Sequence, residues 1–327
     1  MVVTESGSAQ QRRIIFVLGM HRSGTSLTTN VLAELGVALS EDLMPATREN
    51  AKGYFESQTI SLLQDRILSS FNLAWDMPNS MRAFPPQWWR TPSIAPLRNQ
   101  IVAFVRAELE KHPIWGFKDP RTMRMLPMWH DIVAELGAQP SYLLVTRHPN
   151  EVAGSLHARN RLDPVIAELL WLEHNVDALL AVRDKLAGIV DYQDWMDAPY
   201  EQARYVIEKL SLPYPGTDEE MRAMLARVVA PELRHHEAPG NFRLPFTQPL
   251  YEALRKRDIT AALSFADFFN VSRTLTSSVC APLYRKLAEL TNIANQKNQR
   301  IAELEAQMKF VSTQQSQATI AEPKLSP

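Results

Sequence analysis

The stretch that decides the fold is Ile14-Ile-Phe-Val-Leu18, followed by the turn Gly19-Met-His-Arg-Ser-Gly-Thr-Ser26. The first five residues form a continuous apolar run rich in branched side chains, which is typical of a strand buried on both faces. After the turn, apolar residues recur at helical spacing from Ser26 to Leu35, and Gly36 ends the pattern. The segment therefore predicts a buried strand, a glycine-bounded turn and an amphipathic helix.

Three further short apolar runs have the character of buried strands. They are Trp115–Lys118, Tyr142–Thr146 and Ile189–Tyr192. Apolar residues at helical spacing fill the intervals, most clearly over residues 97–109 and 165–179. Strands that alternate with helices favour a parallel sheet covered on both faces. The predicted fold is α/β, with a P-loop-like parallel sheet flanked by helices.

Composition narrows the possible functions. Of the 327 residues, 45% are hydrophobic and 22% are charged, which is the balance of a folded protein with a sizeable core. Lys plus Arg total 35 and Asp plus Glu total 36, so the net charge of −1 offers no basic surplus for nucleic acid. The longest apolar run, Ile14–Met20, is far shorter than the roughly 20 residues that cross a bilayer. We expect a soluble, cytoplasmic protein without a nucleic-acid partner.

The C-terminal part of the chain carries a heptad pattern. Its residues step by alternating fours and threes, which predicts a coiled coil that joins copies of the chain into a homo-oligomer. The alternative is a single amphipathic helix that packs back on its own domain. The expected organisation is a flexible tail (1–13), a catalytic domain (14–279), the heptad helix (280–311) and a disordered tail (312–327). The seam consists of Leu283, Leu287, Leu290, Ala294, Lys297, Ile301, Leu304, Met308 and Val311.

Residues 72–96 interrupt the alternation of strands and helices. Five prolines and the tryptophans Trp75, Trp88 and Trp89 fall within this segment. It is either a packed surface loop or a wall of a substrate pocket, because aromatic side chains commonly line such pockets.

The turn after the first strand has the pattern of a phosphate cradle. Its two glycines and Ser26 fit G-x-x-x-x-G-K-[ST], but Thr25 stands in the lysine position. Glycines allow successive backbone N–H groups to point into one concavity, and the following helix adds its positive end. Arg22 and His21 are expected to supply the charge that the missing lysine would give. The candidate ligand-binding residues of the turn are His21, Arg22, Ser23, Gly24, Thr25 and Ser26.

Two segments resemble the PAPS-dependent sulfotransferases, which use 3′-phosphoadenylyl sulfate (PAPS) as donor. GMHRSGTS (19–26) is similar to their 5′-phosphosulfate-binding loop. LLVTRHPNEVAGSL (143–156) is similar to their 3′-phosphate-binding segment, in which a strand ends in an arginine and a serine follows eight residues later. In this chain these two residues are Arg147 and Ser155.

Three more segments extend the resemblance over residues 14–212. GFKDPRT (116–122) is similar to the Lys-Asp-Pro strand end of the tyrosylprotein branch and of many bacterial members. NAKGYFE (50–56) resembles the bacterial carbohydrate-type members. VDYQDWMDAPYEQARYVIEKLSL (190–212) resembles the Tyr-Glu-Asp strand and the helix after it, with Gln193 where an acidic residue is usual. The family's C-terminal glycine-rich nucleotide loop has no counterpart here, so the resemblance leaves closure over the adenosine open.

The resemblance implies transfer of a sulfuryl group from PAPS to an acceptor hydroxyl by in-line attack, with 3′,5′-ADP as product. The acceptor would be a saccharide, a glycolipid or a peptide tyrosine. Arg147 and Ser155 would hold the 3′-phosphate, and Tyr192 would border the adenine unless it is a core tyrosine. A sulfuryl group carries less charge than a phosphoryl group, so protein cations can replace a metal ion. Arg22 and Lys118 would take that role.

The general base is a choice among three residues. Glu56 is the first, because it closes the NAKGYFE match; its alternative role is to cap a helix over residues 57–70. Glu49 and His157 are the other candidates. Lys118 has an alternative role too, as the salt-bridge partner of Asp119 or Asp131.

Two other functions compete with sulfuryl transfer. A nucleotide or small-molecule kinase of the P-loop type is disfavoured by Thr25 in the lysine position. A nucleotide-binding scaffold without catalytic activity, assembled through the heptad helix, is the other.

Overall fold

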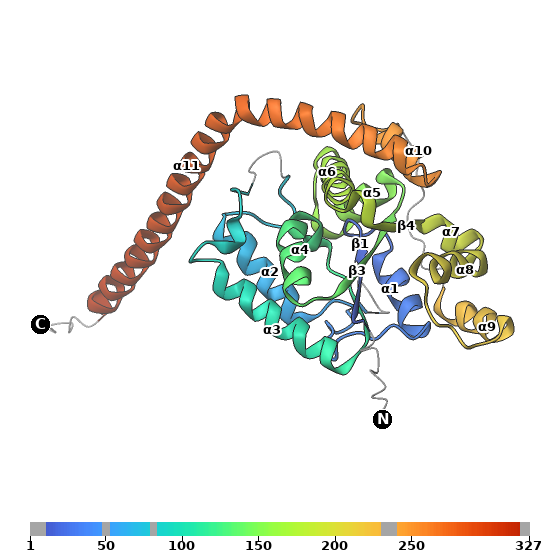
Figure 1. The fold of residues 1–327 in the computed structure, drawn as a ribbon. Coiled ribbons are helices and arrows are strands. Elements are labelled where there is room, and N and C mark those ends of the chain that lie inside the picture. The colour runs from blue at the N-terminus through green and yellow to red at the C-terminus, as the bar shows by residue number, and fades with distance from the viewer. Residues whose placement is uncertain (1–10, 48–52, 79–83, 230–240, 321–327) are drawn as a thin grey trace, which may run out of the picture. The chain divides into compact units, whose positions relative to one another are not determined.

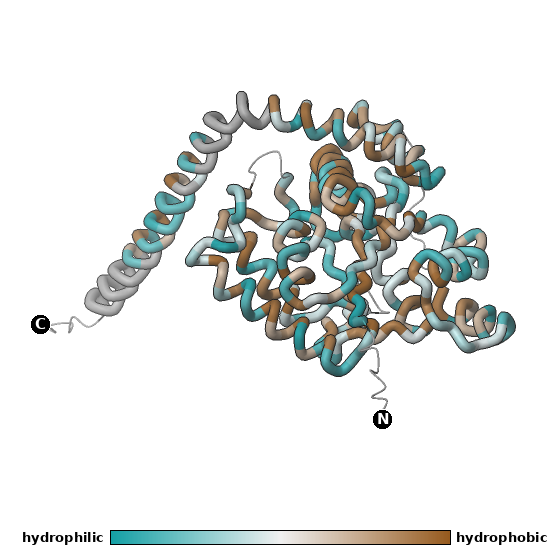
Figure 2. Tube along the Cα trace, viewed as in Figure 1, coloured by the Kyte–Doolittle hydropathy of each residue, from teal (hydrophilic) through white to brown (hydrophobic). Residues whose placement is uncertain are grey.

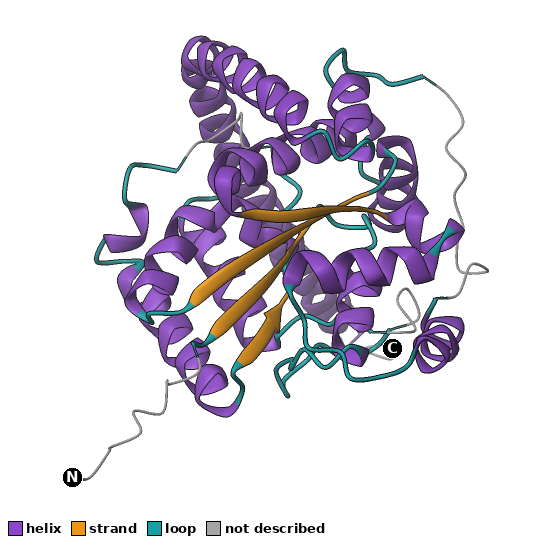
Figure 3. Ribbon diagram, turned by 45° about the vertical axis from the view of Figure 1, so that its right-hand side comes forward, coloured by secondary structure: helices purple, strands orange, loops and turns teal. Residues whose placement is uncertain are grey.

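Four parallel strands form the central sheet, in the order β2-β1-β3-β4 (Figure 3). The computed structural model describes residues 11–47, 53–78, 84–229 and 241–320. All four predicted strands are present, and the α/β prediction is confirmed. Their bounds are β1 (Arg13–Leu18), β2 (Ile114–Phe117), β3 (Gln139–Thr146) and β4 (Leu186–Asp191).

Helices cover both faces of the sheet because successive strand residues point to opposite sides (Figure 1). Ile14 and Phe16 of β1 belong to one buried cluster, whereas Ile15 and Val17 belong to another. The cluster of Ile14 also holds the predominantly apolar α6, which is mostly brown in Figure 2. On that face lie α2 (Gln58–Ser70), α3 (Ala95–Lys111), α4 (Leu126–Glu135) and α6 (Pro164–Val182); on the other lie α1 (Thr25–Glu34), α8 (Pro199–Leu210) and α9 (Asp218–Val228).

Shorter elements follow the strand ends. Two of them place functional side chains. α5 begins three residues after β3, and α7 begins directly after β4, at Tyr192, which the sequence assigns to the end of the strand. The remaining bounds are η2 (Trp88–Arg90), η3 (Pro120–Met125), α5 (Pro149–Asn160), η4 (Arg183–Lys185), α7 (Tyr192–Asp197) and α10 (Thr247–Arg255).

The strand order creates a crevice at the C-terminal ends of β1 and β3. From β1 the chain passes to β2 on one side, and the next strand, β3, lies on the other side. In open α/β sheets, ligands bind where the order reverses in this way. The turn Gly19–Ser26 follows β1 and Arg147 follows β3, so the two predicted anion-binding segments meet at this point.

The aromatic and proline-rich segment divides its tryptophans between two roles. Trp88 is 3% exposed and packs against the rings of Phe71 and Phe84, as in a packed loop. Trp75 instead lies against His21 of the turn, with 4.5 Å between ring centroids. Trp75 is therefore the tryptophan of this segment that contacts the predicted site.

The chain forms two compact units, Met1–Thr274 and Leu275–Pro327. The helix α11 (Ile259–Ile320) crosses this boundary and contains the predicted heptad helix. It continues through residues 312–320, where the sequence suggests a disordered tail, because neither proline nor glycine occurs in that stretch. Among the described residues, no helix is long and apolar enough to cross a membrane.

The heptad seam of the second unit is exposed wherever its side chains are described. The side chains of Leu283, Leu287 and Val311 lie outside the described set. The exposed members are Leu290 (51%), Ala294, Lys297, Ile301 (53%), Leu304 (43%) and Met308 (72%).

Candidate functional site

The turn between β1 and α1 is a tight cradle that only glycine permits at its end. Gly24 has a φ of +90°, and a Cβ atom there would lie 2.4 Å from the Tyr192 ring. The side chain of Ser23 is fully buried, and its hydroxyl has no hydrogen-bond partner among the described residues. The same holds for Nε2 of His21. The cradle therefore presents unpaired polar atoms beside the start of a helix, as an anion site requires.

The environment of His21 favours its neutral imidazole. Burial lowers its pKa well below 6.5, and the nearby cations Arg121 and Arg159 lower it further. The surroundings of His21 therefore oppose the positive charge that the sequence predicts for it. It can still donate or accept a hydrogen bond as a neutral group.

Gly24→Ala is expected to destabilise the protein more than Gly36→Ala. Both glycines have left-handed backbone conformations, with φ of +90° and +92°, so each alanine incurs a backbone cost of about 1–2 kcal/mol. A Cβ atom at Gly36 would meet nothing within 4 Å, whereas one at Gly24 would collide with Tyr192. We expect the clash to add about 1–3 kcal/mol to the loss in unfolding free energy, measured by urea titration. Equal losses would show that Tyr192 does not pack against the turn.

Three residues from two segments form what we call the arginine–serine cluster: Arg22 of the turn, and Arg147 and Ser155 of the segment that follows β3. Nε of Arg22 donates to the Ser155 hydroxyl at 2.7 Å, and Nη1 of Arg147 donates to the Arg22 carbonyl at 3.3 Å. The Arg147 guanidinium also lies over the Tyr192 ring, 4.3 Å from its centroid, and pairs with Glu151 at 2.7 Å. The structure thus brings together the predicted 3′-phosphate ligands and an arginine of the turn.

A buried ion pair lies on the other side of the turn. Nζ of Lys118, just after β2, is 2.5 Å from Oε1 of Glu56 and 3.4 Å from the hydroxyl of Ser26. Lys118 is 2% exposed and Glu56 is 5% exposed. Lys118 thus pairs with Glu56 rather than with Asp119 or Asp131, and it links that carboxylate to the first turn of α1.

The helix cap at α2 is a neighbour of Glu56 rather than Glu56 itself. Ser57 caps α2 and accepts a bond from the backbone of Ile60. Burial raises the pKa of Glu56, and the cations Lys118 and Arg121 oppose that rise. Arg121 lies 3.6 Å from Oε2 of Glu56 and is itself held by Asp119. Glu56 is therefore available for a role other than capping.

The two other candidate bases are not placed beside this pair. His157 is exposed on α5, and its Nδ1 is 3.0 Å from the Leu162 carbonyl. Ser155, two residues earlier, is buried and faces Arg22. Glu49 lies outside the described residues. Within the described part of the chain, Glu56 is the candidate base that Lys118 links to the turn.

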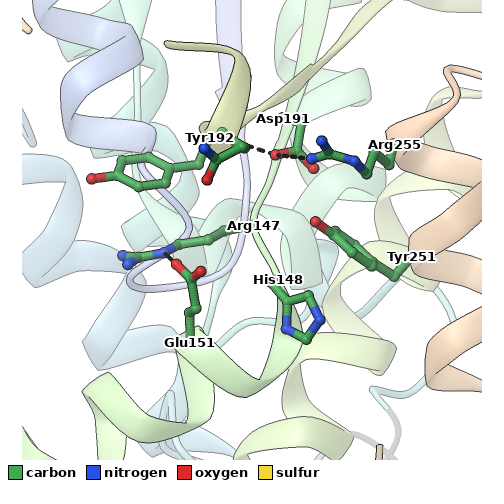
Figure 4. Close-up of a pocket in the computed structure, with 8 residues that line it drawn as sticks. Arg147, His148, Glu151, Asp191, Tyr192, Tyr251 and Arg255 are labelled. Carbon is green, nitrogen blue, oxygen red and sulfur yellow. Dashed lines mark hydrogen bonds and ion pairs between the residues drawn. The ribbon is translucent and has the colours of Figure 1, made fainter. Parts of the chain in front are cut away.

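A cavity of about 260 Å³ opens beyond the arginine–serine cluster, at the ends of β3 and β4 (Figure 4). Arg147 and Tyr192, two of the predicted binding residues, line it. Asp191, Tyr251 and Arg255 also line it and were not among the predicted residues. Asp191 ends β4, and the ligand-binding tendency of strand ends could have identified it. Tyr251 and Arg255 come from α10, where no sequence motif marks them.

The described residues contain no group of three or more His, Cys, Asp or Glu side chains that could hold a metal ion. The adjacent histidines His235 and His236 lie outside the described residues. The cations of the site are instead arginine and lysine side chains that follow three strand ends.

No family model and no curated protein matches the chain. Among solved structures, it is similar to the sulfotransferase domain from the olefin synthase of Synechococcus PCC 7002. The two chains are 20% identical, the match covers 78% of this chain and 95% of that one, and the TM-score is 0.38. A similarity of this degree assigns neither a family nor an activity.

Proposed function

We propose that the protein is a PAPS-dependent sulfotransferase that moves the sulfuryl group of PAPS to an acceptor hydroxyl. The observation that carries the proposal is the arginine–serine cluster beside the P-loop-like turn. A donor with phosphate groups at both its 5′ and 3′ positions needs two adjacent anion sites. The hydrogen bond from Arg22 to Ser155 joins the two segments that would form these sites.

In this proposal each anion site has its own set of donors. The turn would hold the 5′-phosphosulfate through backbone N–H groups and through the hydroxyl of Ser23, which lacks a partner among the described residues. Arg147 and Ser155 would hold the 3′-phosphate, because a guanidinium matches phosphate oxygens with two parallel N–H groups. The contact of Arg147 with Tyr192 would keep that guanidinium in place.

The chemistry is a displacement at sulfur. The acceptor oxygen forms a bond to sulfur as the bond between sulfur and the 5′-phosphate oxygen breaks, and 3′,5′-ADP leaves. Glu56 takes the proton of the acceptor, and its raised pKa makes it a stronger base than an exposed carboxylate. Lys118 and Arg22 stabilise the negative charge that develops on the leaving and bridging oxygens. We propose that these cations suffice without a metal ion.

The acceptor class follows from motif resemblance and remains a saccharide, a glycolipid or a peptide tyrosine. Trp75 offers a flat surface beside His21, suited to stacking against a sugar or a phenol ring. A kinase is not favoured, because Thr25 stands in the position of the P-loop lysine. A scaffold without catalytic activity would not need a buried lysine–glutamate pair at the turn.

Isothermal titration calorimetry tests the donor assignment directly. We expect 3′,5′-ADP to bind without magnesium and more tightly than 5′-AMP, because the second phosphate gains the arginine–serine cluster. ATP with magnesium is the ligand that a kinase would prefer. Equal affinity for 3′,5′-ADP and 5′-AMP, or tight binding restricted to magnesium–ATP, would overturn the proposal.

We also propose that the cytoplasmic enzyme assembles into a homo-oligomer through residues 283–311. The described seam residues are exposed, and such an apolar stripe is stabilised when another helix covers it. Truncation after Val279 is expected to give a monomer that still binds 3′,5′-ADP, since the matched residues precede it. Sedimentation velocity of the full chain and the truncation measures this. A full-length monomer at micromolar concentration would contradict the coiled coil.

A further inference from the structure

The cavity at the ends of β3 and β4 is walled by aromatic rings and has a carboxylate at its edge (Figure 4). Tyr192 lies on the side of the turn, and Tyr251 faces the cavity from α10. The His148 ring meets Tyr251 edge-on, with 5.0 Å between centroids. Flat apolar walls of this kind suit a planar heterocycle.

Asp191 has one oxygen engaged and one oxygen without a partner among the described residues. Its side chain is buried, at 2% exposure. Oδ1 accepts a hydrogen bond from the Gln193 backbone at 2.8 Å and lies 3.5 Å from Nη1 of Arg255. Oδ2 has no hydrogen-bond partner at ordinary distance in the part of the chain that the structure describes, and the Tyr251 hydroxyl is the polar group of α10 that interacts with this carboxylate besides Arg255. A buried acceptor without a donor is costly, so a ligand N–H group that enters the cavity would fill an existing need.

The order of the strands indicates which part of a nucleotide would reach Asp191. The turn follows β1, Arg147 follows β3, and Asp191 ends β4, so the three groups lie in this order along one edge of the sheet. Neighbouring strands are about 4.8 Å apart, so β4 lies about 10 Å from β1. A nucleotide with its 5′ end at the turn and its 3′-phosphate at Arg147 would extend its base toward β4.

We propose that Oδ2 of Asp191 accepts a hydrogen bond from the 6-amino group of the donor's adenine and thereby sets the base selectivity of the enzyme. This inference rests on the proposed function. An ionised carboxylate accepts hydrogen bonds but cannot donate them, so it repels the 6-oxo group of hypoxanthine. Guanine presents two adjacent N–H groups, which would need both oxygens, whereas Oδ1 is already engaged.

Arg255 and Tyr251 complete the arrangement from α10. They are four residues apart on one helix and therefore share a face. Burial raises the pKa of Asp191, whereas Arg255 and the Tyr251 hydroxyl both favour its ionised form. In this way α10 closes the cavity proposed for adenine, in a chain without a recognisable glycine-rich nucleotide loop.

Asp191→Asn is the decisive variant, because asparagine keeps the helix cap. The amide oxygen can still accept the bond from Gln193, which leaves the amide NH₂ toward the cavity. We expect the affinity for 3′,5′-ADP to fall about 10- to 100-fold. The affinity for inosine 3′,5′-bisphosphate should rise, because the NH₂ group can donate to the 6-oxo group. Asp163→Asn, at an exposed cap of α6, is the matched control and should change neither affinity.

The calorimetric outcomes separate this inference from the proposed function. Weak binding of both bisphosphates by the parent protein would overturn the proposed function. Tight binding of 3′,5′-ADP together with equally tight binding of the inosine or guanosine analogue would overturn only the role of Asp191. The role also fails if Asp191→Asn keeps the parent's preference for adenine, as expected if Asp191 contacts the ribose or only caps α7.

Discussion

Glu56→Gln is expected to lower the turnover number about 10²- to 10⁴-fold, the usual contribution of a general base. Glutamine occupies nearly the same volume as glutamate and can still accept a bond from Lys118, but it cannot take a proton. The affinity for 3′,5′-ADP should be unchanged, because the base acts only in the chemical step. Steady-state kinetics with PAPS and calorimetry with 3′,5′-ADP measure the two quantities.

The pH dependence of turnover distinguishes a base from a structural residue. A base must be deprotonated, so activity is present above its pKa and lost below it. Burial raises the pKa of Glu56 above 4.5, and the acid limb of the kcat profile should lie correspondingly higher. Glu56→Gln should remove this limb from the residual activity. A variant with less activity but an unchanged acid limb would assign Glu56 a positioning role toward Lys118.

Glu108→Gln and Glu49→Gln are the two control variants for this experiment. Glu56→Gln leaves the buried ammonium of Lys118 without its counter-charge, so some loss of stability is expected. Glu108→Gln, at a buried glutamate of α3, shows the effect of neutralising a buried carboxylate elsewhere. Normal turnover in Glu56→Gln together with inactivity in Glu49→Gln would transfer the role of base to Glu49.

The strand, turn and helix at residues 14–35 were predictable because their signals are local. A branched apolar run, two glycines and a helical repeat each act over a few neighbouring residues. The cradle needs Gly24 for its left-handed backbone, and a glycine at that place is visible in the sequence. The continuation of α11 to Ile320 also has a local signal, because residues 312–320 contain neither proline nor glycine. The prediction of a disordered tail gave more weight to the polarity of these residues.

Side-chain pairs between distant segments could not be predicted from the sequence. Lys118 and Glu56 were both identified as site residues, but the only salt-bridge partners considered for Lys118 were Asp119 and Asp131. Its partner lies 62 residues away, and packing of α2 near the end of β2 brings the two together. His21 likewise contacts Trp75, which lies in a loop without periodicity. The charge states of these residues therefore could not be predicted without the tertiary structure.

The cavity at the ends of β3 and β4 was even less predictable from the sequence. Asp191 stands next to the predicted Tyr192 at a strand end, so position alone could have suggested it. Its surroundings and its contact with Arg255 are set by α10, which begins more than fifty residues later. Short-range patterns identify a helix there but not the cavity that it closes.

Arg147→Ala is expected to abolish the preference for 3′,5′-ADP over 5′-AMP. Losing a charged hydrogen bond costs about 1.5–3 kcal/mol, which corresponds to a fall of about 10- to 150-fold in the affinity for 3′,5′-ADP. The affinity for 5′-AMP should change little, because that nucleotide has no 3′-phosphate. Calorimetry with both nucleotides on the parent and the variant measures how far the ratio of the two affinities changes.

Arg147→Lys separates the charge of Arg147 from its shape. Lysine keeps a positive charge beside Glu151 but lacks the planar fork that grips two oxygens, so an intermediate preference is expected. Arg98→Ala is the matched control, because Arg98 is also a largely buried arginine held by carboxylates, those of Asp131 and Glu135. It should lose stability without any change in nucleotide preference. If Arg147→Ala weakens 3′,5′-ADP and 5′-AMP equally, the guanidinium supports Tyr192 and the fold of the site, and the 3′-phosphate has no specific ligand in the arginine–serine cluster.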